Sequence, residues 1–353
     1  MNLKKVIINP PSGKLRSTIL IIYTGGTFGM TYDKDGVLMP FDFGLILEHL
    51  PALKNLALKL TVVSFEDPID SSNINPGHWR VLGKIIKENY DTHDGFVVLH
   101  GTDTMAFTAS ALSFMLEGLR KPIVFTGAQL PISEARSDAR ENLITALDIA
   151  SAKKDGEPLV PEVCIYFDYE LLRGNRSKKV ESMQFDAFDS GNYPPLAKAG
   201  VKIDYNFSVI RETDKSKALI LHSIFDPNIS ILKLFPGINQ YTVEAILNTP
   251  NLKAVVMETF GSGNAPTLDW LIDSLKKAVD KGILILNISQ CPGGSVVQGR
   301  YTTSMDLKRI GVIGGADLTT EAAVTKLMLL LGEYGVDRTR ELIRVSLAGE
   351  MST

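Results

Sequence analysis

TILIIYTGGT, residues 18–27, is the stretch of sequence that decides the fold. Its first six residues form a continuous run rich in β-branched side chains, which is typical of a parallel strand buried on both faces. Two consecutive glycines and a threonine follow at once, so a tight loop is expected directly after the strand. This pairing of a buried strand with a glycine loop indicates an α/β domain, in which neighbouring segments repeat the pattern.

The alternation of strand, loop and helix continues downstream. The apolar positions after Pro76 follow helical spacing, and proline suits the first turn of a helix. Further strands are expected at 58–64, 95–99 and 122–125, and helices at 76–90, 104–119 and 136–153. The pattern predicts an α/β fold with a parallel sheet and helices on both of its faces.

The length of the chain suits two domains. Its 353 residues, 44% of them hydrophobic, exceed the usual size of one hydrophobic core. We expect a polar arm at 1–16, a larger N-terminal parallel-sheet domain at 17–200, a polar linker at 201–217 and a smaller C-terminal α/β domain at 218–353. In the last region, strands are expected at 218–222, 254–258 and 283–288, and helices at 242–247, 268–281 and 319–334.

The composition argues against several classes of protein. The formal net charge is -3, so the chain lacks the basic excess that a nucleic-acid partner would need. The two cysteines, Cys164 and Cys291, are far apart and show no metal-ligand spacing, which favours a reducing compartment without a disulfide framework or a metal site. The N-terminus has no apolar signal region, and no run is long enough to span a membrane. We therefore expect a cytoplasmic protein without a membrane partner.

Three of the expected strands end in loops that carry hydroxyl groups. Thr27 closes the first loop, Asp70, Ser71 and Ser72 follow the second strand, and Thr102-Asp103 follows the third. In open parallel sheets, ligands bind beyond the carboxyl ends of the strands, so these side chains should share one crevice. Taken singly, each group could equally be a helix cap or a turn; the combination is more specific.

The combination of TGGT at 24–27 with HGTDT at 100–104 resembles the L-asparaginase family, most closely its bacterial cytoplasmic type I branch. The resemblance extends over essentially the whole chain after residue 16. Further matching segments are DSS at 70–72, TASALSFMLEGL at 108–119, RSD at 136–138, RGNRSKK at 173–179, GSGNAP at 261–266, SQC at 289–291 and GVIGGAD at 311–317.

The resemblance implies a two-step hydrolysis of L-asparagine to L-aspartate and ammonia, without a cofactor. The family nucleophile falls on Thr27, which would form an acyl-enzyme. The second catalytic threonine falls on Thr102, its neighbouring carboxylate on Asp103 and the lysine on Lys179. A hydroxyl is a poor nucleophile at neutral pH and needs a proton path and an oxyanion site. We hypothesise that Lys179 polarises Thr102, which relays a proton or positions the attacking water.

The resemblance also implies a set of substrate contacts. Ser71, flanked by Asp70 and Ser72, would receive the substrate α-carboxylate, and Asp103 the α-ammonium group. Ala128, in TGAQ, falls where family members place a backbone carbonyl near the leaving amide.

The chain departs from the family pattern in the segment after TGGT. Many members carry a tyrosine there, but the type I register places Val37 at that position. Tyr32 could take the role by a shifted loop, and Tyr301 is a distant candidate. The segment 31–40 is expected to form a lid over the site or a plain surface loop.

Two further positions concern regulation and assembly. Some type I enzymes bind asparagine at a second, activating site that uses an arginine and a cysteine. Cys291 matches the cysteine, but Glu258 stands at the arginine position, so weak or absent activation is expected. Asn264 corresponds to a family residue that reaches a neighbouring subunit's site, which implies a homodimer or homotetramer.

Four alternatives remain open. The chain could use asparagine and glutamine alike, since one methylene changes pocket discrimination by only about 1–3 kcal/mol. It could be the ammonia-supplying subunit of a tRNA-dependent amidotransferase, although the short arm argues against this. A nucleotide-binding module is disfavoured because the glycine spacing fits no phosphate-loop pattern. A non-catalytic binding protein of the same fold is the fourth possibility.

Overall fold

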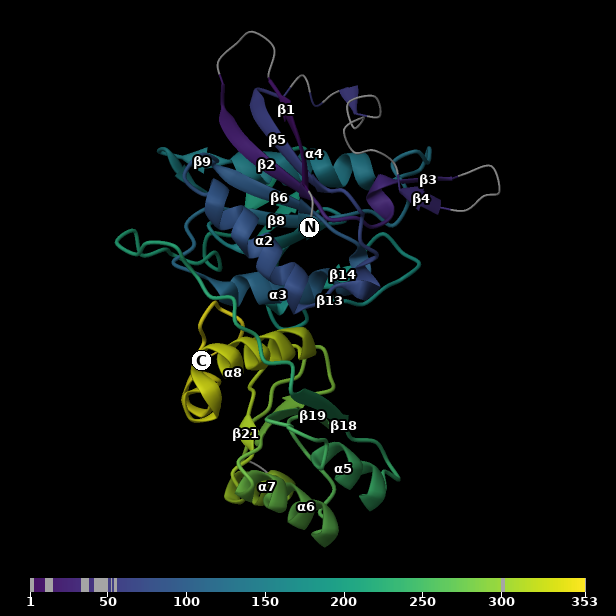
Figure 1. Ribbon diagram of the computed structural model, residues 1–353, viewed down its shortest axis with the longest axis vertical. Helices are drawn as coiled ribbons and strands as arrows, with labels where there is room; N and C mark the ends of the chain where they lie inside the picture. The colour runs from purple at the N-terminus through teal and green to yellow at the C-terminus, as the bar shows by residue number, and fades with distance from the viewer. Residues whose placement is uncertain are drawn as a thin grey trace. The chain divides into compact units, whose positions relative to one another are not determined.

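The computed structural model describes residues 3–9, 15–32, 38–40, 50–51, 53, 56–299 and 302–352. The chain divides into two compact units, each described here by itself (Figure 1). Unit 1 comprises Met1–Ser190 and Pro194–Leu221, and unit 2 comprises Gly191–Tyr193 and His222–Thr353.

A nine-stranded sheet forms the centre of unit 1, in the order β1-β5-β2-β6-β8-β11-β12-β15-β16. Neighbours from β5 to β11 pair in parallel, whereas β1, β12, β15 and β16 pair antiparallel. The strands are β1 (Leu3–Ile8), β2 (Ser17–Tyr23), β5 (Leu58–Phe65), β6 (Gly95–Leu99), β8 (Ile123–Thr126), β11 (Val163–Phe167), β12 (Glu170–Arg173), β15 (Ala197–Ala199) and β16 (Ile203–Tyr205).

The predicted α/β class is confirmed, but the sheet is mixed rather than parallel throughout. The reason lies in the connection between β11 and β12. Only Asp168 and Tyr169 join these strands, and both have positive φ angles of 44° and 66°. A two-residue turn of this kind can join antiparallel strands only, because a parallel return needs a long crossover.

Helices lie on both faces of the unit 1 sheet. In Figure 1, α4 (Ala139–Ser151) lies on one side of β6 and β8, and α2 (Pro76–Asn89) and α3 (Met105–Met115) lie on the other. Asn75 caps α2 by accepting a hydrogen bond from the backbone of Gly77, and Pro76 occupies the first turn as expected. The helices cover strands whose residues are almost all buried.

Two segments expected to lie outside the sheet belong to it. The predicted arm contains β1, which pairs with β5, and the predicted linker contains β16, which pairs with β15. Five of the six β1 residues are exposed. Edge strands of this kind lack the continuous apolar run by which buried strands are found in a sequence. The strand expected at 218–222 is reduced to β17 (Ile220–Leu221), which pairs with β7 (Leu116–Glu117) inside unit 1.

Three short hairpins complete the described part of unit 1. They are β3 (Met30–Tyr32) with β4 (Leu38–Pro40), β9 (Lys153–Lys154) with β10 (Glu157–Pro158), and β13 (Lys178–Lys179) with β14 (Phe188–Asp189).

Unit 2 is built on a four-stranded parallel sheet in the order β18-β19-β20-β21. The strands are β18 (Ile229–Lys233), β19 (Ala254–Thr259), β20 (Leu284–Ser289) and β21 (Ile313–Gly314). The helices are α5 (Gln240–Leu247), α6 (Asp269–Asp280), α7 (Thr302–Arg309) and α8 (Thr320–Leu342). Leu232, Val255, Leu271 and Ile285 are part of one buried cluster that joins the strands to α5 and α6.

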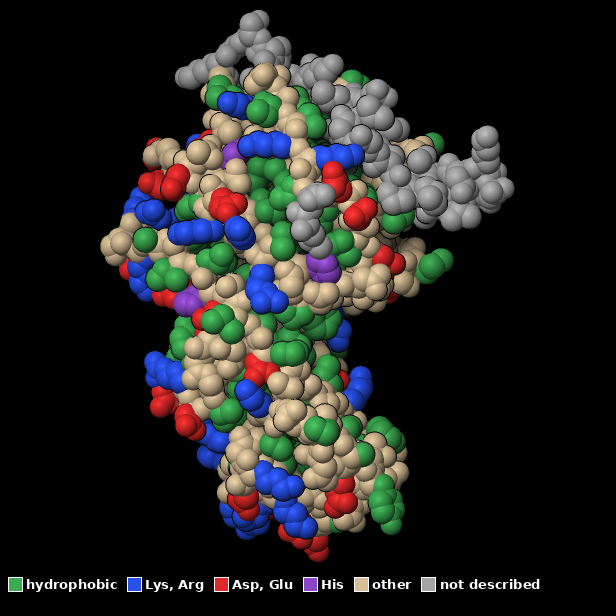
Figure 2. Space-filling model, viewed as in Figure 1, with side chains coloured by type: hydrophobic (Ala, Val, Ile, Leu, Met, Phe, Trp, Pro, Cys, Tyr) green, Lys and Arg blue, Asp and Glu red, His purple; other side chains and the backbone are tan. Residues whose placement is uncertain are grey.

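The surface charges and the lengths of the helices complete the description. On the face seen in Figure 2, acidic and basic side chains are interspersed, and neither sign forms a continuous patch. Among the residues that the structure describes, no helix is both long enough and apolar enough to cross a membrane.

Candidate active site

Three loops meet beyond the carboxyl ends of β5, β2 and β6, which are neighbours in the sheet. The loop after β2 leads into η1 (Thr27–Gly29), the loop after β5 into η4 (Ser71–Asn73), and the loop after β6 into η5 (Thr102–Thr104). Each motif singled out in the sequence therefore begins a short 3-10 turn at the same edge of the sheet.

Glycines allow these loops to contact one another through backbone atoms. Gly25 and Gly26 have φ angles of 135° and 88°, which other residues rarely adopt. A Cβ atom on Gly26 would lie 2.5 Å from the Cα atom of Gly101, and one on Gly25 would lie 2.3 Å from the carbonyl oxygen of Ile69. The loops that carry Thr27, Ser71 and Thr102 are thus packed too closely for any side chain at these glycines.

Hydrogen bonds fix the three loops in place. The amide nitrogen and hydroxyl of Thr24 both donate to the carbonyl oxygen of Leu99, each at 3.0 Å. Ile69 donates to the carbonyl of Thr24 at 2.8 Å, and the hydroxyl of Thr104 donates to the carbonyl of Ser71 at 2.7 Å. Thr24 and Thr104 therefore hold the loops together. The hydroxyls of Thr27 and Thr102 take no part in these contacts between loops.

Thr27 begins η1 and is half-buried. Its hydroxyl forms no hydrogen bond with any residue that the structure describes, as expected of a group available to a substrate. Below it, the hydroxyl of Tyr23 donates to the carbonyl of Gly29 at 3.2 Å. Burial raises the pKa of Tyr23 well above its ordinary value, so this phenol remains a neutral donor that supports the turn.

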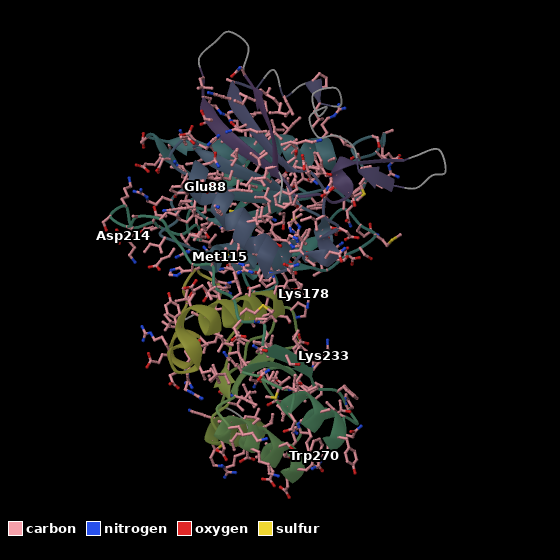
Figure 3. The ribbon with its side chains drawn as sticks, viewed as in Figure 1. Glu88, Met115, Lys178, Asp214, Lys233 and Trp270 are labelled. Carbon is pink, nitrogen blue, oxygen red and sulfur yellow. The ribbon has the colours of Figure 1, made fainter. Side chains whose placement is uncertain are left out.

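Lys179 connects β13 with η5. It lies in β13, beside Lys178, which is labelled in Figure 3. Its Nζ atom lies 2.7 Å from Oγ1 of Thr102 and 2.8 Å from Oδ1 of Asp103. The Lys179 side chain is 17% exposed and that of Asp103 62% exposed, so the lysine is sheltered while the carboxylate faces outward.

Gln129 is a member of the site that the sequence analysis did not single out. Its side-chain oxygen accepts a hydrogen bond of 3.3 Å from Thr102, and its amide group donates to the carbonyl of Gln184 at 2.9 Å. Gln129 directly follows Ala128 in the loop after β8, so the rule that located the other loops could have found it.

A half-buried carboxylate, that of Asp138, supports the Gln129 loop. Asp138 accepts hydrogen bonds from the backbone nitrogens of Gln129 and Leu130, and from the side chain of Asn142 at 3.0 Å. Burial raises the pKa of Asp138, although the backbone donors oppose the shift. Asn142 also donates to the carbonyl of Gly127 at 3.1 Å, which fixes the backbone on the other side of Ala128.

The predicted substrate-contact residues occupy different environments. Ser71 is buried, and a Cβ atom on Gly101 would lie 2.6 Å from its Oγ atom. Asp70 caps η4 by accepting a hydrogen bond of 2.8 Å from the backbone of the exposed Ser72, so both complete a turn. Ala128 is buried between the residues that fix its loop.

His100, which precedes Gly101, has a structural role, because both of its ring nitrogens contact other groups of the protein. Its Nδ1 atom lies 2.7 Å from the carbonyl oxygen of Gly101, and its Nε2 atom 2.9 Å from the hydroxyl of Thr108. Trp79 in turn donates to Thr108 at 3.1 Å. Burial lowers the pKa of His100 to about 4, so the ring is neutral at neutral pH and both ring nitrogens are satisfied.

The tyrosine candidates are only partly placed. The backbone of Tyr32 pairs with that of Leu38 in the β3–β4 hairpin. The side chain of Tyr32 lies outside what the structure describes, as do Val37 and Tyr301. Within the described ranges, no group of three or more His, Cys, Asp or Glu side chains is placed to hold a metal ion.

Two family models match the chain in succession. Residues 18–211 match the N-terminal domain of asparaginase, and residues 228–342 match the glutaminase/asparaginase C-terminal domain. The chain belongs to the asparaginase family. Apart from Gly191–Tyr193, which belong to unit 2, the first match lies in unit 1; the second lies in unit 2, and the three loops described above lie in the asparaginase N-terminal match.

Individual relatives support the family assignment. The chain is 39% identical to L-asparaginase 1 of Escherichia coli K12 over 344 residues, covering 96% of this chain and 98% of that protein. The crystal structure of L-asparaginase I from Vibrio cholerae covers 96% of this chain and all of that one, with a TM-score of 0.87 and 37% identity. The human 60 kDa lysophospholipase is 42% identical across 95% of this chain, which spans only 61% of that protein's length.

Proposed function

We propose that the chain is an L-asparagine amidohydrolase that converts L-asparagine and water to L-aspartate and ammonia. The observation that carries the proposal is the contact of Lys179 with both Thr102 and Asp103, in a site whose loops pack against the loop of Thr27. A threonine hydroxyl can attack an amide, a lysine beside a second hydroxyl can assist proton movement, and a carboxylate can bind the ammonium group of an α-amino acid.

In the first step, the hydroxyl oxygen of Thr27 attacks the side-chain amide carbon of asparagine. The proton of this hydroxyl passes to the leaving nitrogen, the carbon–nitrogen bond breaks, and ammonia leaves with an ester on Thr27. The φ angles of Gly25 and Gly26 let backbone N–H groups approach the carbonyl oxygen closely, where they can stabilise its developing charge.

In the second step, water attacks the ester and releases aspartate. We assign Thr102 to the orientation of this water and Lys179 to the support of Thr102. Asp103, exposed and paired with Lys179, receives the α-ammonium group, and Ser71 receives the α-carboxylate. The carbonyl of Ala128 takes a position near the leaving amide, and the half-buried Asp138 and the buried Asn142 hold that loop. Tyr32 is the proposed phenol beside Thr27.

The test is ammonia release by the purified protein from L-asparagine at neutral pH. Thr27→Ala should abolish release, because it removes the nucleophile, whereas the matched control Thr27→Ser should retain part of it. L-glutamine and a lysophospholipid are assayed alongside, the second because the human relative named above is a lysophospholipase. Release of ammonia by Thr27→Ala at the wild-type rate would refute the assignment, and preference for glutamine or the lysophospholipid would replace the proposed substrate.

We further propose that activation by asparagine at a second site is weak or absent, because the position of the arginine is occupied by Glu258. Its side chain is buried, accepts a hydrogen bond of 2.6 Å from Thr320 and lies 3.5 Å from Lys233. A carboxylate so placed repels the α-carboxylate of a second asparagine. The proposed assembly is a homodimer or homotetramer, in which Asn264 reaches the site of a neighbouring subunit.

A further inference from the structure

The orientation of the Gln129 side chain is fixed by its contacts. Its nitrogen lies 2.9 Å from the carbonyl oxygen of Gln184, which can only accept a hydrogen bond. The amide must therefore present its nitrogen to Gln184 and its oxygen to Thr102. The Gln129 oxygen has no hydrogen to donate, so in the contact between these residues Thr102 is the donor.

This contact determines what the Thr102 hydroxyl can do. A hydroxyl has one hydrogen to donate and two lone pairs that accept. The hydrogen is directed to Gln129, and one lone pair accepts from Nζ of Lys179 at 2.7 Å. One lone pair remains. Toward the substrate, Thr102 is therefore an acceptor, able to hold one hydrogen of a water molecule.

The frame around Gln129 keeps this arrangement stable. Its backbone nitrogen donates to both carboxylate oxygens of Asp138, at 3.1 and 3.0 Å. Asp138 is held in turn by Asn142 at 3.0 Å. The backbone of Gln129 is thus held by Asp138, directly before α4, and its side chain by the carbonyl of Gln184.

We propose that Gln129 is a positioning residue that keeps Thr102 an acceptor toward the attacking water, and so governs release of the acyl group. The inference rests on the proposed function. In the step concerned, the water oxygen bonds to the ester carbon while Thr102 holds one water hydrogen. The bond from that carbon to Thr27 Oγ breaks, one water proton ends on Thr27, and aspartate leaves.

Replacement of Gln129 should therefore slow the second step alone. Without its acceptor, the Thr102 hydroxyl turns its hydrogen toward the water and no longer directs a lone pair at it. At 3.3 Å the bond is longer than the usual 2.7–2.8 Å, so its loss should cost the modest factor expected of one neutral hydrogen bond, about three- to tenfold. Formation of the acyl-enzyme does not use this lone pair and should proceed at the wild-type rate.

The experiment is rapid-mixing and steady-state measurement of ammonia release from L-asparagine by Gln129→Met. We expect kcat and KM of Gln129→Met to fall by the same factor, about three- to tenfold, so that kcat/KM is unchanged. We also expect a burst of one ammonia per site. Gln129→Glu keeps an acceptor oxygen for Thr102 but loses the donor to the Gln184 carbonyl, so its burst should be smaller than that of Gln129→Met. Gln129→Ala repeats the test with a smaller side chain. The matched control is Gln184→Met, which keeps the backbone carbonyl and should behave as wild type.

Three results would overturn the inference: wild-type kcat in Gln129→Met, a fall in kcat/KM without a burst, or a burst of equal size in Gln129→Glu. Failure of the proposed function is seen separately, because the wild type would then release no ammonia from L-asparagine.

Discussion

The two units each contain a lysine–carboxylate pair of almost the same length in very different surroundings. In unit 2, Nζ of Lys326 lies 2.6 Å from Glu350, and neither side chain is exposed at all. In unit 1, Nζ of Lys179 lies 2.8 Å from Asp103, whose side chain is 62% exposed. The distances do not distinguish the pairs, so the difference must lie in what else each partner binds.

The buried pair is saturated with partners from the protein. Besides Glu350, Lys326 donates to the carbonyl oxygens of Ile343 and Val345, at 3.1 and 2.6 Å. Glu350 accepts from the backbone nitrogens of Leu347 and Ala348. All three hydrogens of the ammonium group are used, which leaves nothing to offer a ligand.

The pair in unit 1 is open by comparison. Lys179 contacts Thr102 and Asp103, and the outward-facing carboxylate keeps acceptor capacity for another molecule. The comparison teaches that a saturated ion pair can only hold the chain together, whereas an unsaturated one can still bind another molecule. Removal of either lysine should separate the two roles.

The largest expected effect is that of Lys326→Met on stability. The substitution leaves the Glu350 carboxylate buried without its counter-charge, which typically lowers the free energy of unfolding by about 3–5 kcal/mol. Denaturant unfolding, followed by a signal from unit 2, measures the loss. The folded fraction should keep the wild-type turnover per site. An unfolding free energy within about 1 kcal/mol of wild type would show that the saturated pair is not structural.

Lys179→Met should show the opposite pattern. It removes a donor to Thr102, and loss of one such group from an active site typically lowers kcat by about 10²–10³-fold. The free energy of unfolding should change by less than about 1 kcal/mol, because the Asp103 carboxylate left behind is 62% exposed and remains solvated by water. Ammonia release and denaturant unfolding on the same sample provide both values. Near-normal turnover would remove Lys179 from the mechanism, and Lys178→Met serves as the neighbouring control.

Sequence reasoning succeeded where a segment carries its own signal. The run at 18–23 predicted β2 because a strand buried on both faces must be apolar throughout, and Pro76 marked the start of α2. It failed for the edge strands β1, whose residues are mostly exposed, and β16, which is only three residues long. The two-residue turn after β11, which makes the sheet mixed, contains neither glycine nor asparagine to reveal it.

The residues of the site likewise divide into those that the sequence predicts and those that it does not. Thr27, Thr102 and Asp103 stand in recognisable motifs, so their loops could be placed at one edge of the sheet in advance. The contact of Gln129 with Thr102 joins residues 27 positions apart on different loops, and nothing in their spacing signals it. Likewise, the sequence does not show that Lys326 and Glu350 are saturated, because their partners are backbone groups of a segment with no distinctive composition.

The smallest expected effect is on the pH dependence of the free energy of unfolding, and it provides a further comparison of the two pairs. Burial raises the pKa of Glu350, but Lys326 and the backbone donors outweigh it and hold that pKa below its ordinary value. A carboxylate with a lowered pKa stabilises the folded state fully above the unfolded-state value of about 4.3. This contribution is lost as pH falls through the folded-state value, at up to about 1.4 kcal/mol per pH unit.

Glu350→Gln should therefore be less stable than wild type at pH 7, and the difference should shrink as the pH is lowered below about 4.3. Thermal unfolding of both proteins from pH 7 to pH 3 measures that difference directly and cancels the contributions of carboxylates they share. Asp103→Asn is the matched variant of the open pair and should stay close to wild type in Tm at pH 7, because its side chain is 62% exposed. A difference between Glu350→Gln and wild type that stays constant down to pH 3 would mean that Glu350 is not held ionised by Lys326. The saturated pair would then owe its stability to packing and hydrogen bonds rather than to charge.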